Sequence, residues 1–264
     1  MKPREFINKH LLWGQTRITK GTPRADIARF LRSVFPVSTE HALIRVGGES
    51  DGGYLIPDDL IGVRTCFSPG VSDNAGFEEA LAERGIRSFM ADYSVQGPPV
   101  ENALFHFEKK YLGSRNDESL TTLKSWVERN APNESEMVLQ MDIEGAEYAV
   151  LLSTPPEILK RFRIIIIEFH GVDTLAERRG LELIGMAFER LLGDFDVAHA
   201  HVNNCAEVIS YAGFDLPPVM EFTFHRKDRS RSRKPTLRFP HPLDQACVRG
   251  LKDIRLPFCW YATP

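Results

Sequence analysis

The sequence predicts a doubly wound α/β fold with a mostly parallel sheet, and three observations support this prediction. Short apolar runs alternate with amphipathic segments of helical periodicity, glycine turns separate several of them, and acids close three of the apolar runs. These acids are Asp92, Asp142 and Glu168. Ligands bind at the carboxyl edge of such a sheet. We therefore expect the acids to serve a site there.

The first 40 residues are predicted to be helical. Glu5–Trp13 and Ala25–Phe35 are amphipathic, and Thr22 is a candidate N-cap for the second helix, with Pro23 in its first turn. We expect both helices to cover one end of the sheet. A hairpin follows, and its turn falls at Asp51-Gly52-Gly53 because Asp-Gly is a strong turn signal. These glycines would also let the backbone approach a ligand as a lid.

The next segment has the order of a nucleoside-binding half-domain. Val63–Pro69 is predicted as a strand, Gly70 as a turn, Val71–Arg84 as a helix and Ile86–Asp92 as a second strand that ends in an acid. The dinucleotide fingerprint G-x-G-x-x-G is missing, since only Gly70 and Gly76 are present. This disfavours a dinucleotide and favours a ligand without phosphates, such as S-adenosylmethionine.

Further strands bring more polar groups to the same edge. Val138–Asp142 is predicted to pass directly into a helix that begins near Ile143. The β-branched run Ile164–Ile167 predicts a central strand buried on both faces, and it ends in Glu168 and His170.

The remaining elements complete the predicted sheet. Helices are expected at Leu120–Glu128 and Leu175–Leu192, whereas Phe105–Tyr111 has no clear assignment. Phe195–His201 and Val219–His225 alternate between polar and apolar residues. We expect these two strands to pair antiparallel and to close a seven-stranded sheet.

Four motifs resemble those of a known family: Ser68-Pro69-Gly70-Val71-Ser72, Met141–Glu147, Ile166–His170 and His201–Cys205. Together they resemble the FkbM-type S-adenosylmethionine-dependent methyltransferases over roughly Arg45–Arg226. The Asp-x-Glu-Gly-Ala-Glu motif is the most specific of them. The resemblance implies a class I methyltransferase fold and, usually, O-methylation of a hydroxyl on a sugar or secondary metabolite. It does not carry the identity of the small-molecule or glycan acceptor.

Composition fits one catalytic domain with appendages. The 264 residues, 42% of them hydrophobic, suffice for one packed core. We expect an N-terminal helical extension over 1–40, a class I methyltransferase domain over 41–226, and a basic loop with a packed tail over 227–264. The net charge of −3 gives no overall attraction to nucleic acid. Four cysteines without a C-x-x-C pair, and no signal peptide or long apolar segment, predict a cytoplasmic protein without a membrane span.

Two features of the C-terminal part have competing interpretations. His201, Cys205, Cys247 and Cys259 could ligate zinc, but their spacing matches no common zinc site, which argues against it. The basic segment Arg226–Lys234 is predicted to be a solvated, mobile loop. Its functional alternative is an electrostatic contact with an anionic acceptor.

The candidate cofactor-binding residues surround the first turn and the acidic strand ends. They are Ser68, Pro69, Gly70, Val71, Ser72, Asp92, Tyr93, Asp142 and Glu144. Gly70 would form the close turn against the cofactor, and Asp92 would accept hydrogen bonds from the ribose hydroxyls. The alternatives are a plain turn glycine and a cap at a strand end.

The candidate catalytic residues are His170, Glu168 and Asp142. His170 is expected to be the general base because an imidazole titrates near neutrality, and Glu168 could orient it. Asp142 could instead be a helix N-cap. Glu144 and Glu147 would then share a helix face, where acids near the N-terminus are stabilised without a catalytic role.

Metal and acceptor sites are predicted from the same edge. Asp142, Glu168 and Asn203 offer the oxygen ligands that Mg²⁺ or Mn²⁺ prefers. Tyr54, His201 and Asn204 are the candidate acceptor-binding residues.

Two other functions remain open from the sequence. One is an NAD-dependent oxidoreductase of the short-chain type, which the missing G-x-G-x-x-G and Tyr-x-x-x-Lys motifs disfavour. The other is a catalytically silent cofactor-binding scaffold, with the basic loop docking a partner.

Overall fold

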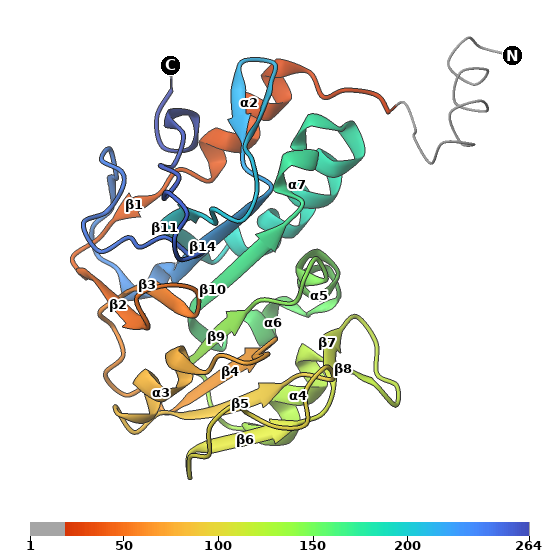
Figure 1. Ribbon diagram of the computed structural model, residues 1–264, viewed down its shortest axis with the longest axis vertical. Helices are drawn as coiled ribbons and strands as arrows, with labels where there is room; N and C mark the ends of the chain where they lie inside the picture. The colour runs from red at the N-terminus through yellow and green to blue at the C-terminus, as the bar shows by residue number, and fades with distance from the viewer. Residues whose placement is uncertain (1–18, 264) are drawn as a thin grey trace, which may run out of the picture.

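A computed structural model describes residues 19–263, so the amphipathic stretch Glu5–Trp13 lies outside the described residues (Figure 1). Its central feature is a seven-stranded sheet with the order β11-β14-β10-β9-β4-β5-β6. The strands are β4 (Thr65–Pro69), β5 (Arg87–Ala91), β6 (Phe105–Glu108), β9 (Met137–Met141), β10 (Phe162–His170), β11 (Phe195–Val202) and β14 (Val219–Arg226). Only β14 runs antiparallel to its neighbours within this sheet. The predicted doubly wound, mostly parallel seven-stranded sheet is therefore confirmed.

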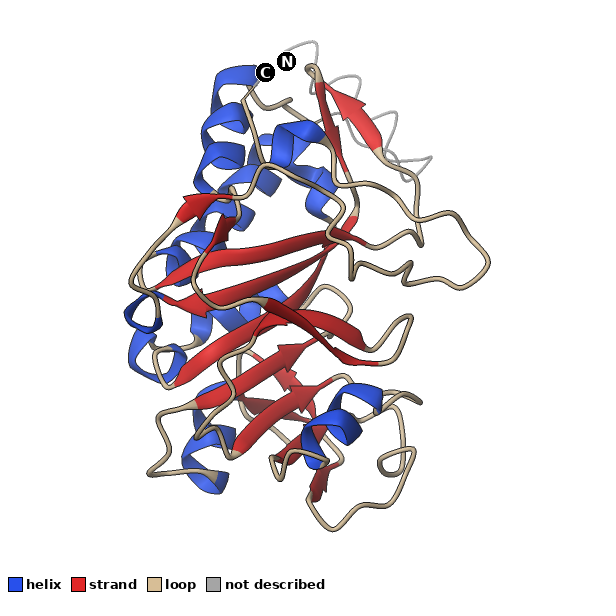
Figure 2. Ribbon diagram, turned by 90° about the vertical axis from the view of Figure 1, so that its left-hand side faces the viewer, coloured by secondary structure: helices blue, strands red, loops and turns tan. Residues whose placement is uncertain are grey.

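The two faces of the sheet are covered differently. Ile165 and Ile167 of β10 belong to the main core, under helices α2 (Arg24–Ser33), α4 (Leu123–Asn130), α5 (Glu147–Ser153), α6 (Pro156–Leu159) and α7 (Arg178–Leu192). Ile164 and Ile166 face a second core, under α3 (Gly76–Ala82) and the hairpin of β2 (Leu43–Gly47) and β3 (Gly53–Pro57). Figure 2 shows most helices on one side of the strands. Burial on both faces explains why Ile164–Ile167 of the central strand is an unbroken β-branched run.

Short strand pairs and 3-10 turns complete the described chain. The pairs are β1 (Val37–Ser38) with β15 (Lys234–Pro235), β7 (Tyr111–Gly113) with β8 (Leu120–Thr122), and β12 (Ile209–Tyr211) with β13 (Phe214–Leu216). The 3-10 turns are η2 (Val172–Ala176), η3 (Lys227–Arg229) and η4 (Phe258–Trp260). Phe30 of α2 packs edge-on against Phe188 of α7 and Trp260 of η4. The N-terminal helix thus covers α7 and the tail.

Several predicted boundaries are wrong, and each has a local cause. Helix α2 has Pro23 as its N-cap without a side-chain cap bond, so Thr22 does not cap it. The predicted helix from Val71 is interrupted at Ser72, whose φ is 48°, and α3 begins at Gly76, whose N–H donates to the Asn74 side-chain oxygen. Helix α4 begins at Leu123, where Thr122 accepts a bond from the Ser125 backbone N–H. The unassigned aromatic stretch forms edge strand β6 and the start of β7.

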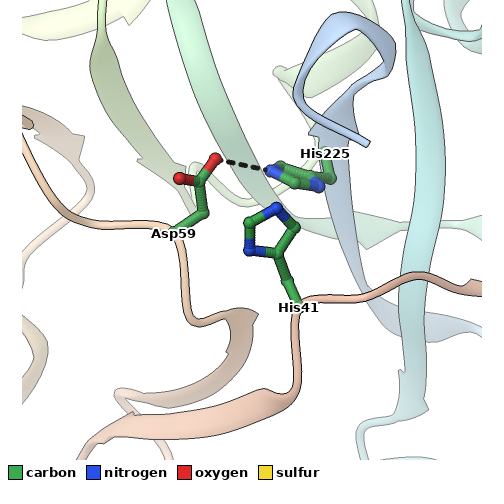
Figure 3. Close-up of side chains that lie close together, drawn as sticks. All are labelled: His41, Asp59 and His225. Carbon is green, nitrogen blue, oxygen red and sulfur yellow. Dashed lines mark hydrogen bonds and ion pairs between the residues drawn. The ribbon is translucent and has the colours of Figure 1, made fainter. Parts of the chain in front are cut away.

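The basic segment Arg226–Lys234 is not the free loop that was predicted. Arg226 binds Glu136 at 2.5 Å, and Arg229 binds Asp59 at 2.9 Å. Asp59 also accepts from Arg163 at 3.3 Å and contacts His225 at 3.1 Å; Figure 3 shows Asp59 and His225 beside His41. Asp59 and Glu136 precede β4 and β9, whereas Arg163 lies at the start of β10 and His225 near the end of antiparallel β14, so the set lies at the amino edge of the sheet. The segment therefore neutralises the buried Asp59 and the partly exposed Glu136 at the edge opposite the predicted site.

Candidate functional site

A cavity of about 650 Å³ opens at the carboxyl edge of the sheet. Its wall is formed by the residues that follow β4, β5 and β9, together with the turn of the β2–β3 hairpin. The lining residues are Asp51, Gly52, Tyr54, Gly70, Val71, Ser72, Asp73, Asn74, Phe77, Glu78, Ala91, Asp92, Ser94, Tyr111, Leu112, Leu120, Gln140, Asp142, Ile143, Glu144 and Ala146. The Asp51-Gly52-Gly53 segment is thus a hairpin turn that also borders the cavity.

The charge of the cavity wall is of one sign. Among the described residues that line it, every ionisable group other than tyrosine is acidic: Asp51, Asp73, Glu78, Asp92, Asp142 and Glu144. Such a wall repels phosphates and attracts a cation. The charge of the site therefore disfavours a dinucleotide ligand, independently of the missing G-x-G-x-x-G motif.

Gly70 forms the turn after β4, but for a reason other than the one predicted. Its φ is +87°, and a Cβ at this position would lie 1.5 Å from the Asp142 carbonyl oxygen. The glycine is therefore required by the contact between two strand ends, because any side chain would collide with backbone. A larger residue at position 70 would displace Asp142 instead of only occupying cofactor space.

Asp92 follows β5 and is buried in the cavity wall. One carboxylate oxygen accepts from the Ser72 N–H at 2.9 Å, and the other accepts from the N–H and hydroxyl of Ser94 at 2.8 and 2.7 Å. A carboxylate has about four acceptor positions, so one remains for a ligand hydroxyl. Asp92 thus orders the wall and can also accept a hydrogen bond from a ligand hydroxyl.

Three candidate cofactor-binding residues do not line the cavity. Ser68 and Pro69 are buried in β4, behind the wall. Tyr93 is 44% exposed and packs against Tyr111 at a centroid distance of 5.3 Å. Of the predicted first turn, Gly70, Val71 and Ser72 reach the cavity.

Glu78 is a cavity residue that the sequence analysis missed. It lies on α3 and is fully buried, and burial raises its pKa to about 7. The Ser68 hydroxyl is bonded both to Glu78 and, at 2.6 Å, to the Gln140 side-chain oxygen. A hydroxyl has a single proton and can donate in only one of these bonds. If Glu78 is protonated, it donates to the Ser68 hydroxyl, and the hydroxyl donates to Gln140. Gln140 in turn donates to the Tyr54 hydroxyl at 3.0 Å.

The Asp-x-Glu-Gly-Ala-Glu motif forms a turn and not the first turn of a helix. Glu144 and Gly145 have φ of 56° and 99°, and α5 begins only at Glu147, with Ala146 as its N-cap. One oxygen of the buried Glu147 carboxylate accepts from the N–H groups of Ile143 and Gly145 at 3.1 and 3.0 Å. Asp142 is therefore no N-cap, and Glu144 and Glu147 share no helix face.

His170 is surrounded by the carboxylates of that turn and of its own strand. Its Nε2 lies 3.3 Å from Glu144, 3.5 Å from Glu168 and 4.0 Å from Asp142, and its Nδ1 lies 3.3 Å from Glu147. Burial lowers the pKa of His170, but the Glu147 hydrogen bond and the nearby negative charges outweigh it and raise the pKa to about 9. The side chain is an imidazolium at neutral pH, so the expected titration near neutrality is not found.

Asp142 is the acid beside His170 that titrates near neutrality. Burial raises its pKa to about 7, against the opposing charge of His170. Burial and the charges of Asp142 and Glu221 raise the pKa of Glu168 to about 9. One buried oxygen of Asp142 has no hydrogen-bond partner among the described residues. Such an oxygen in a cavity wall is free to bind a ligand proton.

The other candidate residues divide between the site and its support. The side-chain amide of Asn203 donates to Glu168 at 3.0 Å, and its oxygen accepts from the Cys205 N–H. The residue that stands with Asp142 and Glu168 as a possible metal ligand is His170, and not Asn203. Asn204 accepts from the Val248 N–H at 2.7 Å and holds the tail. His201 is buried outside the cavity wall. Of the predicted acceptor residues, Tyr54 alone lines the cavity.

Comparison with known proteins identifies the family. A sequence model of the methyltransferase FkbM domain matches residues 66–205. The chain belongs to this FkbM methyltransferase family. The match spans the strands from β4 to β11, including the turn between Asp142 and Glu147. The seven-stranded sheet of this FkbM domain has the class I methyltransferase architecture predicted from the sequence.

Solved structures that resemble the FkbM chain are distant from it in sequence. A 1,6-didemethyltoxoflavin-N1-methyltransferase from Burkholderia thailandensis, with bound S-adenosylhomocysteine, is 13% identical, with 63% of this chain and 72% of that chain covered and a TM-score of 0.33. A TehB-like SAM-dependent methyltransferase from Corynebacterium glutamicum is 10% identical, with 84% and 96% covered and a TM-score of 0.31. No curated protein sequence matches the chain.

Within residues 19–263, we find no helix with both the length and the hydropathy needed to cross a membrane.

Proposed function

We propose that the protein is an S-adenosylmethionine-dependent O-methyltransferase in which Asp142 accepts the proton of the acceptor hydroxyl. The observation that carries this proposal is the cavity wall, where every ionisable group other than tyrosine is an acid. Two of these acids, Glu78 and Asp142, have a pKa near 7, and of the two Asp142 has a buried oxygen without a partner among the described residues. A base works best when its pKa lies near the working pH. The acidic wall also disfavours a polyanionic acceptor such as nucleic acid, so the proposed acceptor is a sugar, a glycan or another small hydroxylated molecule.

The residues present fit the cofactor. Asp92 would accept hydrogen bonds from its ribose hydroxyls, and the turn at Gly70–Ser72 would border it. The surrounding carboxylates, Asp51 and Glu144 among them, would stabilise its positive charge. When bound, S-adenosylmethionine supplies an electrophilic methyl group.

The protein's part in the reaction is alignment and proton transfer. The cavity wall would hold the acceptor oxygen toward the methyl group that S-adenosylmethionine would supply, and Asp142 would take the hydroxyl proton. The His170 imidazolium, held between Glu147 and Glu168, keeps Asp142 ionised near neutral pH because opposite charges favour the charged form. His170 and Glu168 are thus positioning residues for the proton acceptor.

A test separates this function from its alternatives. Calorimetry should show binding of S-adenosylhomocysteine and none of NAD, and turnover on a panel of hydroxylated acceptors should give O-methylated products. Asp142→Asn should lower turnover about 10²–10⁴-fold with little change in S-adenosylhomocysteine affinity. Asp58→Asn, the same change at an exposed residue of the opposite edge, is the control. Full turnover by Asp142→Asn, or binding of NAD, would contradict the proposal.

The pH dependence gives an independent check. Asp142 must be ionised to accept a proton, so turnover should rise about tenfold per pH unit below about 7 and level off above it. Asp142→Asn should lose this step. A rise that survives in the variant would assign the proton to another group.

A divalent cation at this edge stays a proposal. Asp142, Glu168 and His170 bring one ligand atom each within 4.8 Å of the others, with His170 in the place that the sequence suggested for Asn203. If Mg²⁺ or Mn²⁺ is needed, turnover should vanish after dialysis against a chelator and return when the ion is added. Activity that is unaffected by chelation would contradict the metal site. The charge of these acids would then be reduced by protonation and not by a metal ion.

A further inference from the structure

We propose a zinc site formed by His201, Glu221 and Cys247, next to the cofactor cavity but outside its wall. The three residues come from different parts of the chain. His201 is the second-last residue of β11, Glu221 lies directly opposite it on antiparallel β14, and Cys247 belongs to the segment after β15. All three side chains are buried, with at most 8% of each residue exposed. Sequence spacing could not reveal this set, because its members are separated by 19 and 25 residues, and no common zinc motif has these intervals.

The distances between the ligand atoms match tetrahedral zinc. His201 Nδ1 lies 3.3 Å from a Glu221 oxygen, Cys247 Sγ lies 3.4 Å from a Glu221 oxygen, and Sγ lies 3.8 Å from Nδ1. Zinc bonds of about 2.3 Å to sulfur and about 2.0–2.1 Å to nitrogen or oxygen put neighbouring ligands about 3.3–3.6 Å apart in a tetrahedron. An ion can therefore enter with small movements of the three side chains.

The surroundings of His201 are those of a metal-binding histidine. Its second ring nitrogen, Nε2, lies 3.2 Å from an Asp253 oxygen. A histidine that ligates zinc usually donates its other N–H to a carboxylate, which fixes the ring and the tautomer. The set of thiolate, imidazole and carboxylate favours zinc over magnesium or calcium, which prefer oxygen ligands only.

Charge balance distinguishes this cluster from a second one of similar shape. His41, Asp59 and His225 also come together, as Figure 3 shows, but Arg163 and Arg229 already pair with Asp59 and would repel a cation. By contrast, no lysine or arginine of the described chain pairs with Glu221 or Asp253. A metal ion beside His201 would therefore balance the negative charge of Glu221, whereas the charge of Asp59 is already balanced by two arginines.

A zinc ion here would tie the C-terminal segment to the sheet and to the cavity. Cys247 accepts a backbone bond from Asp51 at 3.1 Å, and Asp51 lies in the hairpin turn that lines the cavity. Zinc binding requires the Cys247 thiolate, whose charge burial otherwise opposes. Three protein ligands leave a fourth position for water or another oxygen ligand.

Metal analysis of the full chain tests the site without reference to methyl transfer. Protein purified without chelators and dialysed against micromolar zinc should hold about one zinc per chain. Cys247→Ser and His201→Ala should lose it, whereas Cys205→Ser, at an exposed cysteine outside the cluster, should retain it. In cobalt-substituted protein, the sulfur-to-cobalt charge-transfer band should be present in the wild type and in Cys205→Ser, and absent in Cys247→Ser.

Two results would overturn the zinc site. Wild-type protein that holds no zinc and shows no thiolate–cobalt band would leave His201 as an imidazolium between Glu221 and Asp253, an ion pair only. A band that persists in Cys247→Ser would assign the metal to another cysteine. The wild-type measurements need no variant to fold, and circular dichroism of each variant shows whether its metal loss reflects unfolding. Because no methyl transfer is measured, failure of the proposed methyltransferase activity would not affect the outcome.

Discussion

The amino edge and the carboxyl edge of the sheet both carry clustered acids but treat them in opposite ways. At the amino edge, Asp59 and Glu136 are paired with arginines, among them Arg163, which binds both. Their pKa values are lowered, because hydrogen bonds and charges from these partners outweigh burial. At the carboxyl edge, Asp142 and Glu168 face one another and His170, and burial raises the pKa of both acids.

The opposite pKa shifts at the two edges distinguish structural acids from acids that are available for chemistry. An acid with an arginine partner is ionised, satisfied and costly to remove. An acid that is buried without a fixed cation keeps a pKa near the working pH and can exchange a proton or bind a positive ligand. The surplus of acid at the carboxyl edge thus coincides with the cavity, whereas the basic segment serves the other edge.

The largest effect should come from removing a paired acid. Asp59→Asn removes the buried carboxylate that Arg163, Arg229 and His225 share, and it leaves Arg163 with Glu136 alone, so we expect a loss of about 3–5 kcal/mol in the free energy of unfolding. Urea denaturation measures it, with the neighbouring exposed Asp58→Asn, expected within about 0.5 kcal/mol of wild type, as the control. A loss below about 1 kcal/mol would remove the distinction between the edges.

A smaller effect should come from an acid of the cavity, and it should appear in binding. Asp92→Asn removes the charge from the hydrogen bonds that we propose to a ribose diol, so S-adenosylhomocysteine should bind about 1.5–3 kcal/mol more weakly. Calorimetry should be used to measure the affinity of Asp92→Asn and of Asp59→Asn for S-adenosylhomocysteine, which compares one acid of each edge. If Asp59→Asn weakens binding as much as Asp92→Asn in protein that is still folded, the two edges are not separate in function.

The smallest effect is a pH dependence of opposite sign at the two edges. The folded-state pKa of Glu78 is raised from 4.5 to about 7, so its contribution to stability is present below pH 4.5 and is lost as the pH rises through 7. The pKa of Asp59 is lowered, so its contribution is present above about pH 4 and is lost as the pH falls further. Glu78→Gln should therefore remove a decline on the order of 1 kcal/mol per pH unit between pH 5 and 7.

The matching measurement is thermal unfolding of the ligand-free protein over that pH range. Glu79→Gln, the adjacent and exposed residue of α3, is the control and should keep the decline. Equal slopes for wild type and Glu78→Gln would show that Glu78 is ionised in the folded protein.

The strands could be predicted because their signals are local. The run Ile164–Ile167 has to be buried on both faces, and its end therefore places Glu168 and His170 at the ligand edge. The Asp51-Gly52-Gly53 turn could be predicted as a possible lid because Asp-Gly is a local signal. Glu78 could not be placed in the cavity, since its position depends on how α3 packs on the sheet. The protonation of His170 was missed because Glu144 and Glu147 reach it through a turn that looks helical in sequence.

The basic segment was mistaken for a free loop for a related reason. Its partners Asp59, Glu136 and Asp196 are dispersed over the chain, and only the closed sheet brings them to one edge. A run of arginines carries no local sign of distant acids. Charge patterning along a sequence therefore locates a basic segment but does not say whether it faces solvent or its own protein.

The contact between Gly70 and the Asp142 carbonyl limits how this protein can change during evolution. Two strand ends that leave no room for a methyl group behave as one rigid part, so the cofactor turn and the proton acceptor cannot be altered independently. New acceptor specificity has to come from segments that do not pass through this contact. The side chains of Asp51 and Tyr54 in the hairpin line the cavity outside this contact, so they can change while the chemistry stays fixed.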